Sequence, residues 1–340
     1  MIKAEREAVL AALEAVSPGL SPKGVIEQSE CFIFRKGKVF AYNDEEFCQA
    51  PLPLNGIEGA VPAKRLVGLL QGLKEDELGF EQSNGELRIR GKGRTAGITM
   101  NAEVLLPIDQ VERPAKDAWV KVGERYGEAM MMAQECAGRD AKDFATAIVH
   151  FHPKWIEAFD NYQMLRYTIN TKLDKPTVVK SKGVKVAAGI GVSAVALTES
   201  WMWFKNERGL VVGCRRFVHD FFDLGANVVI DGEKVSLPKG LVAACEIAEG
   251  FSAEDADNNV VTVEMKPGKL RVMSRGVSGW YEERKEIKYD GRGMRFIISP
   301  KILREIVAKH NDVFLSETRL KVDGGKWVYC TVIGSPENKD

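Results

Sequence analysis

Gly189, Gly191 and Ala194 have the spacing Gly-x-Gly-x-x-Ala, in which glycines let the backbone approach a dinucleotide pyrophosphate at the start of a helix. Such a site requires these residues at a turn from a strand into a helix. In the internal repeat described below, however, the segment matches residues 68–73 and falls at the end of a helix. We therefore expect no nucleotide site here.

His150 and His152 alternate along a predicted strand, so their side chains share one face and could bind a metal ion. No cysteine or carboxylate pattern nearby completes a metal site. The sequence also has no Gly-x-Ser-x-Gly, no His-Glu-x-x-His and no P-loop pattern, so no reaction has a candidate nucleophile. We predict a non-catalytic protein with no metal ion and no cofactor.

Three lysines mark an internal repeat. Lys64, Lys182 and Lys301 are 118 and 119 residues apart, and each stands near the start of a segment with apolar residues at helical spacing. Residues 62–70 and 299–307 match in residue type and share an early proline, which favours the first turn of a helix. The period has the size of a domain.

A second element keeps nearly the same period. Lys38, Lys154 and Lys269 are 116 and 115 residues apart, and each follows a Gly or Pro that separates two strand-like runs. The pattern predicts a β-hairpin in each copy. Because two independent elements recur in the same order, we interpret the chain as three copies of one unit.

Each copy reads as helix, hairpin, connecting strand, helix and hairpin, so it contains one half-motif twice. The first helices are predicted at residues 6–16, 126–137 and 241–248. The last strand-like runs are 78–81 with 86–90, 195–204 with 210–215, and 313–315 with 319–332. The polar stretches 112–117 and 220–227 suggest domains at 1–114, 115–224 and 225–340. We predict an α+β fold of three repeated domains, each with two helices against antiparallel sheets.

The composition limits the class of protein. Lysine plus arginine and aspartate plus glutamate both number 48, so any surface for nucleic acid must be local. Six scattered cysteines without a CxxC pair are typical of reduced, buried thiols in a cytosol. The first 16 residues read as an amphipathic helix, and the longest nearly uncharged run, 186–197, is too short to span a membrane. We expect a soluble cytoplasmic protein.

Basic side chains recur on the predicted helices, where repetition would align them along one surface. Such a surface would attract phosphates without sequence preference, although each residue could equally belong to an ordinary solvated helix face. The candidate DNA-facing residues are Lys3, Arg6, Lys64, Arg65, Lys121, Arg125, Arg139, Lys182, Lys239, Lys301, Arg304 and Lys309.

Three stretches resemble the bacterial DNA polymerase III beta subunit, the sliding-clamp family. The second half of that family's first domain is similar to PAKRLVGLLQGL and the following LGFEQSNGELRIRGKGRTAGITM. The family signature ATDGHRL resembles AFDNYQML, and the family's last strand resembles VYCTVIG. The resemblance covers residues 1–334. It implies three domains per chain, two chains closed head to tail into a six-domain ring, and helices that face duplex DNA.

The resemblance also implies a pocket between the second and third domains that binds short apolar peptide motifs of polymerases and clamp loaders. Carried over by position, the pocket residues are Phe159, Asn161, Tyr162, Gln163, Met164, Ser299, Ile302, Cys330 and Val332. The sequence departs from the family where Asn161, Tyr162 and Gln163 replace Gly-His-Arg, which puts the family's peptide preference in doubt.

The expected function is that of a processivity factor, a homodimeric ring on duplex DNA that tethers the replicative DNA polymerase. It would act in the bacterial cytoplasm or nucleoid, and this expectation includes a phage-encoded clamp. Two other functions are compatible with a repeated α+β chain. One is a small-molecule-binding protein, which would need a convergent polar pocket, and the other is a repeat scaffold that does not contact DNA.

Overall fold

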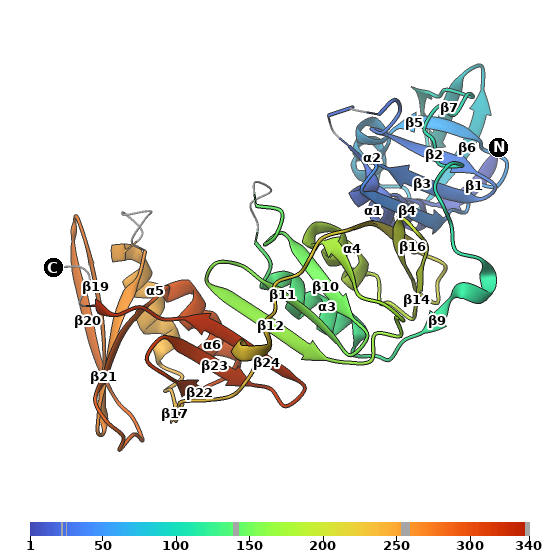
Figure 1. The fold of residues 1–340 in the computed structure, drawn as a ribbon. Helices are drawn as coiled ribbons and strands as arrows, with labels where there is room; N and C mark the ends of the chain where they lie inside the picture. The colour runs from blue at the N-terminus through green and yellow to red at the C-terminus, as the bar shows by residue number, and fades with distance from the viewer. Residues whose placement is uncertain (22, 25, 139–142, 253–258, 337–340) are drawn as a thin grey trace. The chain divides into compact units, whose positions relative to one another are not determined.

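The computed structural model describes residues 1–340 except 22, 25, 139–142, 253–258 and 337–340. Within the described residues, one order of elements occurs three times: a strand, a helix, four strands, a helix and three strands (Figure 1). Each copy therefore contains two successive half-motifs, and each half-motif consists of a strand, a helix and three strands. This confirms the predicted doubled half-motif and adds three strands to each copy, one at each end and one between the first hairpin and the second helix.

The first copy consists of β1 (Ile2–Glu5), α1 (Arg6–Val16), β2 (Cys31–Arg35), β3 (Lys38–Tyr42), β4 (Glu46–Pro51), β5 (Gly59–Pro62), α2 (Ala63–Gly72), β6 (Glu77–Ser83), β7 (Glu86–Gly91) and β8 (Arg94–Thr99). The second consists of β9 (Val120–Lys121), α3 (Tyr126–Glu135), β10 (Ile148–His152), β11 (Trp155–Phe159), β12 (Gln163–Thr168), β13 (Thr177–Lys180), α4 (Ser181–Gly189), β14 (Ala194–Leu197), β15 (Trp201–Lys205) and β16 (Val211–Phe217). The third consists of β17 (Glu233–Ser236), α5 (Leu241–Ser252), β18 (Val261–Lys266), β19 (Lys269–Gly276), β20 (Gly279–Glu286), β21 (Met294–Ile298), α6 (Pro300–Lys309), β22 (Asp312–Leu315), β23 (Arg319–Asp323) and β24 (Trp327–Val332).

The chain divides into two compact units. Unit 1 comprises Met1–Ala158 and Ile169–Phe221, and unit 2 comprises Phe159–Thr168 and Phe222–Asp340. Unit 1 thus holds the first two copies apart from β12, while unit 2 holds the third copy together with β12. The three-domain division stays a prediction, because the first two copies pack into one unit.

All strand pairs are antiparallel, and each complete copy builds two four-stranded sheets. In unit 1 the first copy forms the orders β4-β3-β2-β5 and β1-β6-β7-β8. In unit 2 the third copy forms the corresponding orders β20-β19-β18-β21 and β17-β22-β23-β24. Within each copy the two helices contact each other, as α1 with α2, α3 with α4 and α5 with α6. The predicted α+β class with antiparallel sheets is confirmed.

Within unit 1 the first two copies are joined by strand pairing. β4 pairs with β16, with Gln49 opposite Val211 and Phe47 opposite Gly213. The ring of Phe47 packs edge to face on that of Trp203, 5.4 Å between centroids. This junction therefore combines a backbone ladder with an aromatic core.

Three consecutive carboxylates extend this junction. Ion pairs link Asp44 to Arg215, Glu45 to Lys180 and Glu46 to Lys182. Apolar residues of the connection between the copies join the core cluster that contains Phe47 and Trp203; they are Leu106, Ile108 and Val111. The predicted boundary at residues 112–117 lies in this connection.

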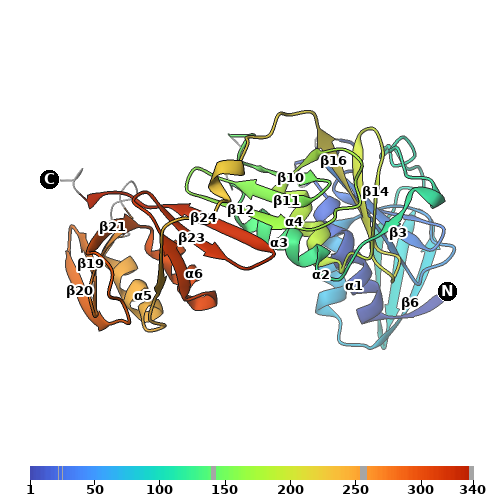
Figure 2. The same ribbon diagram turned by 60° about the horizontal axis from the view of Figure 1, so that its bottom comes forward.

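Helices of both copies in unit 1 cover the same face of the joined sheet. α1 packs on β4 and α4 packs on β16 (Figure 2). Glu46 points to this face, because its carboxylate meets Lys182 of α4, and a Cβ at Gly183 of α4 would lie 3.0 Å from Sγ of Cys214 and 3.8 Å from Cγ of Glu46. Consecutive copies can thus place their helices along one wall.

Two predicted strand-like runs were wrong in extent. Residues 195–204 form β14 and β15 with a turn between them, and residues 319–332 form β23 and β24. All six cysteines are free and buried, as expected, and burial raises the pKa of the Cys48 thiol to about 12. None of the described helices combines the length and apolar character that crossing a membrane demands.

Candidate functional site

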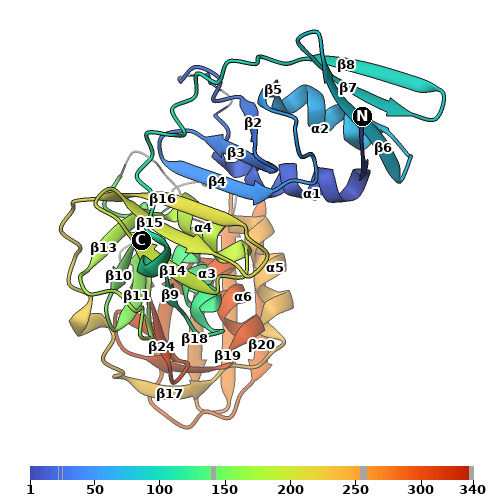
Figure 3. The same ribbon diagram turned by 90° about the vertical axis from the view of Figure 1, so that its right-hand side faces the viewer.

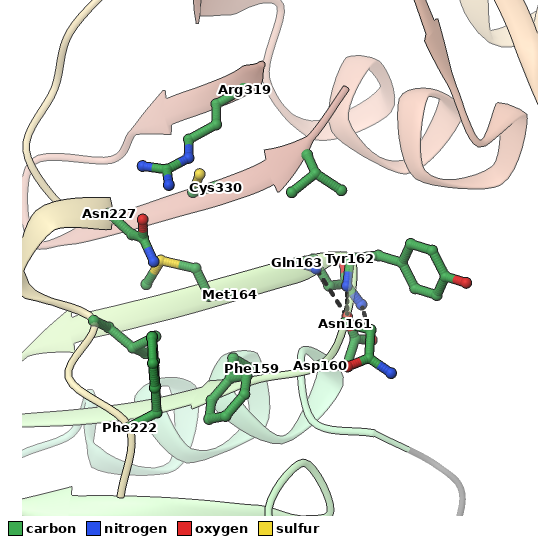
Figure 4. Close-up of a pocket in the computed structure, with 12 residues that line it drawn as sticks. Phe159, Asp160, Asn161, Tyr162, Gln163, Met164, Phe222, Asn227, Arg319 and Cys330 are labelled. Carbon is green, nitrogen blue, oxygen red and sulfur yellow. Dashed lines mark hydrogen bonds between the residues drawn. The ribbon is translucent and has the colours of Figure 1, made fainter. Parts of the chain in front are cut away.

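A small pocket of about 220 Å³ lies within unit 2, where β12 pairs with β24 (Figure 4). Most of its lining is apolar, with a few amide and charged groups at its ends, a composition typical of peptide and ligand sites. The lining residues are Phe159, Asp160, Asn161, Tyr162, Gln163, Met164, Phe222, Leu224, Asn227, Arg319, Cys330 and Val332.

A tight turn after Phe159 forms one end of the pocket. Asp160 Oδ1 accepts hydrogen bonds from the backbone N–H groups of Tyr162 and Gln163, both at 2.8 Å. Asp160 Oδ2 accepts a third from Nε2 of Gln163 at 3.3 Å. The short carboxylate closes the turn as aspartate commonly does, and its oxygens are occupied by doing so.

The turn is fixed to the last strand of the chain. The Val332 N–H and the Thr331 hydroxyl both donate to the Tyr162 carbonyl at 2.9 Å. Tyr329 Oη donates to Gln163 Oε1 at 2.8 Å. The Tyr162 ring is exposed and points away from the pocket (Figure 4). These bonds hold the turn residues against β24.

The floor of the pocket is a cross-strand pair. Met164 lies opposite Cys330, and both are buried. Burial raises the pKa of the Cys330 thiol, so this side chain is neutral and behaves as a small apolar residue. The rings of Phe159 and Phe222 add an aromatic wall, with centroids 5.8 Å apart.

The structure brings together seven of the nine predicted pocket residues. Ser299 and Ile302 do not line the pocket, because Ser299 stands at the N-cap position of α6 and Ile302 lies on that helix, which packs against α5. The sequence prediction missed five lining residues, namely Asp160, Phe222, Leu224, Asn227 and Arg319. Phe222 and Leu224 stand in the polar stretch 220–227, where their apolar side chains were a usable signal.

A buried cation supports the wall of unit 2 beside the pocket. Lys321 on β23 is 1% exposed, and its Nζ donates to the Val229 carbonyl at 2.6 Å and to Asp231 Oδ1 at 2.5 Å. The hydrogen bond from Lys321 is the main cause that lowers the pKa of Asp231 below its ordinary value. The ammonium group depends on this carboxylate for its only countercharge among the residues that the structure describes.

Removing that countercharge should destabilise unit 2. We expect Asp231→Asn to lower the free energy of unfolding by about 1 to 2 kcal/mol, because a buried ammonium loses its ionic partner, whereas Lys321→Met should be close to neutral. Asp231 ionises more readily in the folded state, so its contribution exists above the unfolded pKa of about 3.9 and is lost as the pH falls through the lower folded value. Urea unfolding at pH 7 and at low pH measures both effects. Equal losses for the two variants would contradict this account.

The predicted DNA-facing residues do not all lie on helices. Lys3 and Lys121 lie on β1 and β9, Arg125 immediately precedes α3, and Lys239 precedes α5. Their assignment to helices was wrong because β1 and β9 are short polar strands, which pair with β6 and β14. Arg139 lies outside the described residues.

Two of the helical arginines already have partners. Arg6 donates to the carbonyls of Leu70 and Glu75, at 3.4 and 3.1 Å, beside the end of α2. Arg304 of α6 pairs with Glu249 of α5 at 2.9 Å. These guanidinium groups link neighbouring elements, so they are poorly placed to bind phosphate.

The exposed charges are divided between the two helices of every copy. The first helices carry carboxylates on their outer faces: Glu7 and Glu14 on α1, Glu128 and Glu135 on α3, and Glu246 on α5. The second helices carry exposed cations, with Glu305 of α6 as an exposed carboxylate among them: Lys64 and Arg65 on α2, Lys182 and Lys185 on α4, and Lys301 and Lys309 on α6. Any surface for phosphate is therefore expected on α2, α4 and α6.

Comparisons of the whole fold give a consistent result. No protein-family model matches the sequence, and a search of curated proteins gives no match. Solved structures do match over 98% of this chain. The DNA polymerase III beta chain of Streptococcus pneumoniae has 13% identity and a TM-score of 0.81 over 99% of its length, and the beta subunit of Thermotoga maritima has 14% and 0.80 over 98%. The beta subunit of Pseudomonas aeruginosa has 12% identity and a TM-score of 0.79 over 99% of its length. This chain has the sliding-clamp fold.

Within this clamp fold, the two signals that were set aside have structural explanations. Gly189 is the last residue of α4 and Gly191 has φ +73° just after it, which confirms that the segment falls at the end of a helix. The buried carboxylate of Glu157 binds Nδ1 of His150 at 2.8 Å, and the ring of His152 stacks on Trp155. Among the described residues, no three His, Cys, Asp or Glu side chains are grouped as a metal site would require.

Proposed function

We propose that this chain is the subunit of a DNA sliding clamp. Two copies close head to tail into a ring around duplex DNA, and the ring tethers a replicative DNA polymerase and a clamp loader through the pocket of unit 2. The protein acts as a non-catalytic processivity factor in the bacterial cytoplasm, on chromosomal or phage DNA.

The pattern of strand junctions carries this proposal. β4 of the first copy pairs with β16 of the second, and β12 of the second pairs with β24 of the third. In both junctions, the last strand of the first half-motif of one copy pairs with the last strand of the second half-motif of the next copy. The same rule applied once more joins β20 of the third copy to β8 of a first copy, which two chains can supply reciprocally.

The edges of β8 and β20 are suited to that junction. Each is the end strand of its sheet, and no described strand covers its outer edge. Figure 3 shows β8 at the margin of its sheet. Next to the β20 edge, Trp280 is 64% exposed and Val277 93%. An uncovered edge with large apolar side chains favours pairing with another chain.

The directions of the amides agree with the proposed ladder. Two-residue turns connect Gly91 to Arg94 and Gly276 to Gly279, and a hydrogen-bonded pair closes such a turn. Because hydrogen-bonded pairs alternate along antiparallel strands, the outward N–H groups belong to Thr95, Gly97 and Thr99 on β8, and to Trp280, Glu282, Arg284 and Glu286 on β20. Each edge thus offers a run of unpaired donors.

Two further features support the roles of DNA and protein partners. Helices α1 and α4 cover one face of the joined sheet in unit 1, so closure of the ring would line its inner wall with helices. The cations of α2, α4 and α6 would then meet phosphates without base contacts. The apolar pocket with a fixed polar turn suits a short peptide held by one or two apolar side chains.

Topological retention on DNA tests the proposal. The purified chain is diluted to dissociate dimers, mixed with nicked circular plasmid and concentrated again. We expect co-elution with the circle in gel filtration at a salt concentration that removes non-specific binding, and release when a restriction enzyme linearises the plasmid. Equal retention on circular and linear plasmid, or no retention on either, would contradict an encircling ring.

The proposed DNA-facing surface of the second helices is tested by two matched triple variants that reverse lysine charges. Lys64→Glu, Lys185→Glu and Lys301→Glu together should weaken binding to a short duplex at least about tenfold and reduce its salt dependence, because phosphate contacts are lost in every copy. Lys185 is chosen on α4 because Lys182 pairs with the buried Glu46. Lys38→Glu, Lys154→Glu and Lys269→Glu change the net charge equally at exposed hairpin positions. Fluorescence anisotropy over a salt series compares the two triple variants. Similar losses in both would show that net charge, not the helix surface, determines binding.

A further inference from the structure

We propose that Arg319 makes the pocket of unit 2 selective for a peptide that carries a carboxylate next to its apolar anchor residues. This inference rests on the proposed role of the pocket in binding partner peptides. It adds the chemical class of the partner segment, an acidic and apolar motif in place of a purely apolar or amide-bearing one.

The position of Arg319 follows from the ladder between β23 and β24. Arg319 lies opposite Val332, and its side chain lines the pocket beside Cys330 (Figure 4). The residue is half-buried, so part of its surface is removed from water by the pocket wall. A guanidinium group at such a place presents several N–H donors in a plane, which matches the two oxygens of a carboxylate.

Arg319 has no ion-pair or side-chain hydrogen-bond partner among the residues that the structure describes. Asp231 lies within reach of its charge, since Arg319 contributes to the lowered pKa of Asp231 after the larger contributions of Lys321. However, Asp231 Oδ1 binds the buried ammonium of Lys321 at 2.5 Å. That carboxylate is therefore already paired with a buried cation, and no ion pair or hydrogen bond joins it to Arg319 among the described residues.

The acidic residue inside the pocket is committed as well. Both oxygens of Asp160 accept hydrogen bonds within the turn, from the Tyr162 and Gln163 N–H groups and from the Gln163 amide. Figure 4 shows Asp160 beside Asn161 and Gln163, on the side of the pocket away from Arg319. The pocket thus has a satisfied anionic end and a cationic end that lacks a partner.

A second donor lies on the cationic side. The side-chain amide of Asn227 also lines the pocket, and Figure 4 shows it on the same side of Met164 as Arg319. An incoming carboxylate could accept from the guanidinium and from this amide while its apolar neighbours fill the space above Met164 and Cys330. A peptide lysine in place of that carboxylate would be repelled by Arg319, and a peptide glutamine there would lose the ionic part of the interaction.

The gain in peptide affinity from the carboxylate should be moderate, because the site is partly open to solvent, where ion pairs are weakened. We expect a Glu-bearing peptide to bind about fivefold more tightly than its Gln counterpart at low salt, and the difference to shrink as salt is added.

A peptide array on the full-length protein tests the inference. Each peptide carries Leu and Phe separated by zero to three alanines and flanked by one Glu, Gln or Lys. The strongest binders are remade as fluorescein-labelled peptides and titrated by anisotropy. We expect the order Glu, Gln, Lys for the unchanged protein. Arg319→Gln should remove the preference for Glu, and Arg319→Lys should keep part of it.

Arg295→Gln is the matched control, because Arg295 is an exposed arginine of unit 2 that neither lines the pocket nor lies on β8 or β20. Equal affinity for Glu and Gln peptides, or an unchanged preference in Arg319→Gln, would overturn the inference while leaving the proposed peptide pocket intact. Failure of every peptide to bind would overturn both, and retention on circular DNA would then report separately on the ring.

Discussion

Arg284→Pro is expected to raise the dissociation constant of the dimer by about tenfold or more, and Thr95→Pro to do the same. Each proline removes one N–H group that faces the open edge of β20 or β8, so a ladder hydrogen bond between chains is lost and the opposing carbonyl is left unpaired. The pairing of β20 with β19 and of β8 with β7 should survive, because their hydrogen bonds use the alternate residues. Sedimentation equilibrium over a concentration series measures the change.

Alanine at the same two positions is the control, since Arg284→Ala and Thr95→Ala shorten the side chain but keep the amide. Mixing the two proline variants gives a sharper test. A head-to-tail dimer of one Thr95→Pro chain with one Arg284→Pro chain has one intact junction and one that carries both prolines. We expect this mixture to associate but not to remain on circular DNA. Proline variants that dimerise as tightly as the alanine variants would exclude β8 and β20 as the interface.

The helices and hairpins could be predicted because their signals are local. α1 begins at Arg6 and ends at Val16 as predicted, since its buried residues Val9, Leu13 and Val16 repeat at helical spacing. The first strands of the copies could not be predicted in this way. β1, β9 and β17 are two to four residues long and mostly polar, and each is defined by pairing with a strand far along the chain.

The same dependence on distant residues explains why residues 195–204 were predicted as one strand-like run. The turn between β14 and β15 has no Gly or Pro, and the carboxylate of Glu112 in the connection between copies accepts the Glu199 and Ser200 N–H groups at 3.1 Å. A sequence window around residue 199 does not contain that acceptor. Secondary structure here depends on a residue almost ninety positions away.

The pocket of unit 2 illustrates how an error in strand prediction leads to an error in predicting site residues. When residues 319–332 are taken as one strand, Arg319 and Val332 lie at opposite ends of it. The structure folds this run into β23 and β24, which places Arg319 directly opposite Val332. Residues adjacent along the chain, such as Phe159, Gln163 and Met164, were found from the motif. The cationic residue of the pocket, Arg319, became visible only with the register of the ladder.

Val332→Glu is expected to abolish binding of apolar partner peptides and the stimulation of a polymerase on primed circular DNA. Val332 is 49% exposed at the rim of the pocket, so a glutamate there can stay hydrated when the pocket is empty, but an apolar side chain of the peptide would have to desolvate it. Because Val332 contributes its N–H to the bond with Tyr162, and not its side chain, the turn should keep its shape. Peptide titration and primer-extension length measure the two losses.

Met164→Glu tests the floor of the same pocket, with a greater risk to folding because Met164 is buried opposite Cys330. Its melting temperature must therefore be measured alongside, and Val332→Glu carries the interpretation if Met164→Glu unfolds. Val218→Glu places the same charge on an exposed valine of unit 1 and should leave extension length unchanged. If Val332→Glu lost peptide binding but kept processivity, partners would attach elsewhere on the ring. If Val332→Glu lost both peptide binding and processivity but was still retained on circular DNA, encirclement of DNA and binding of partners would be separable functions of this protein.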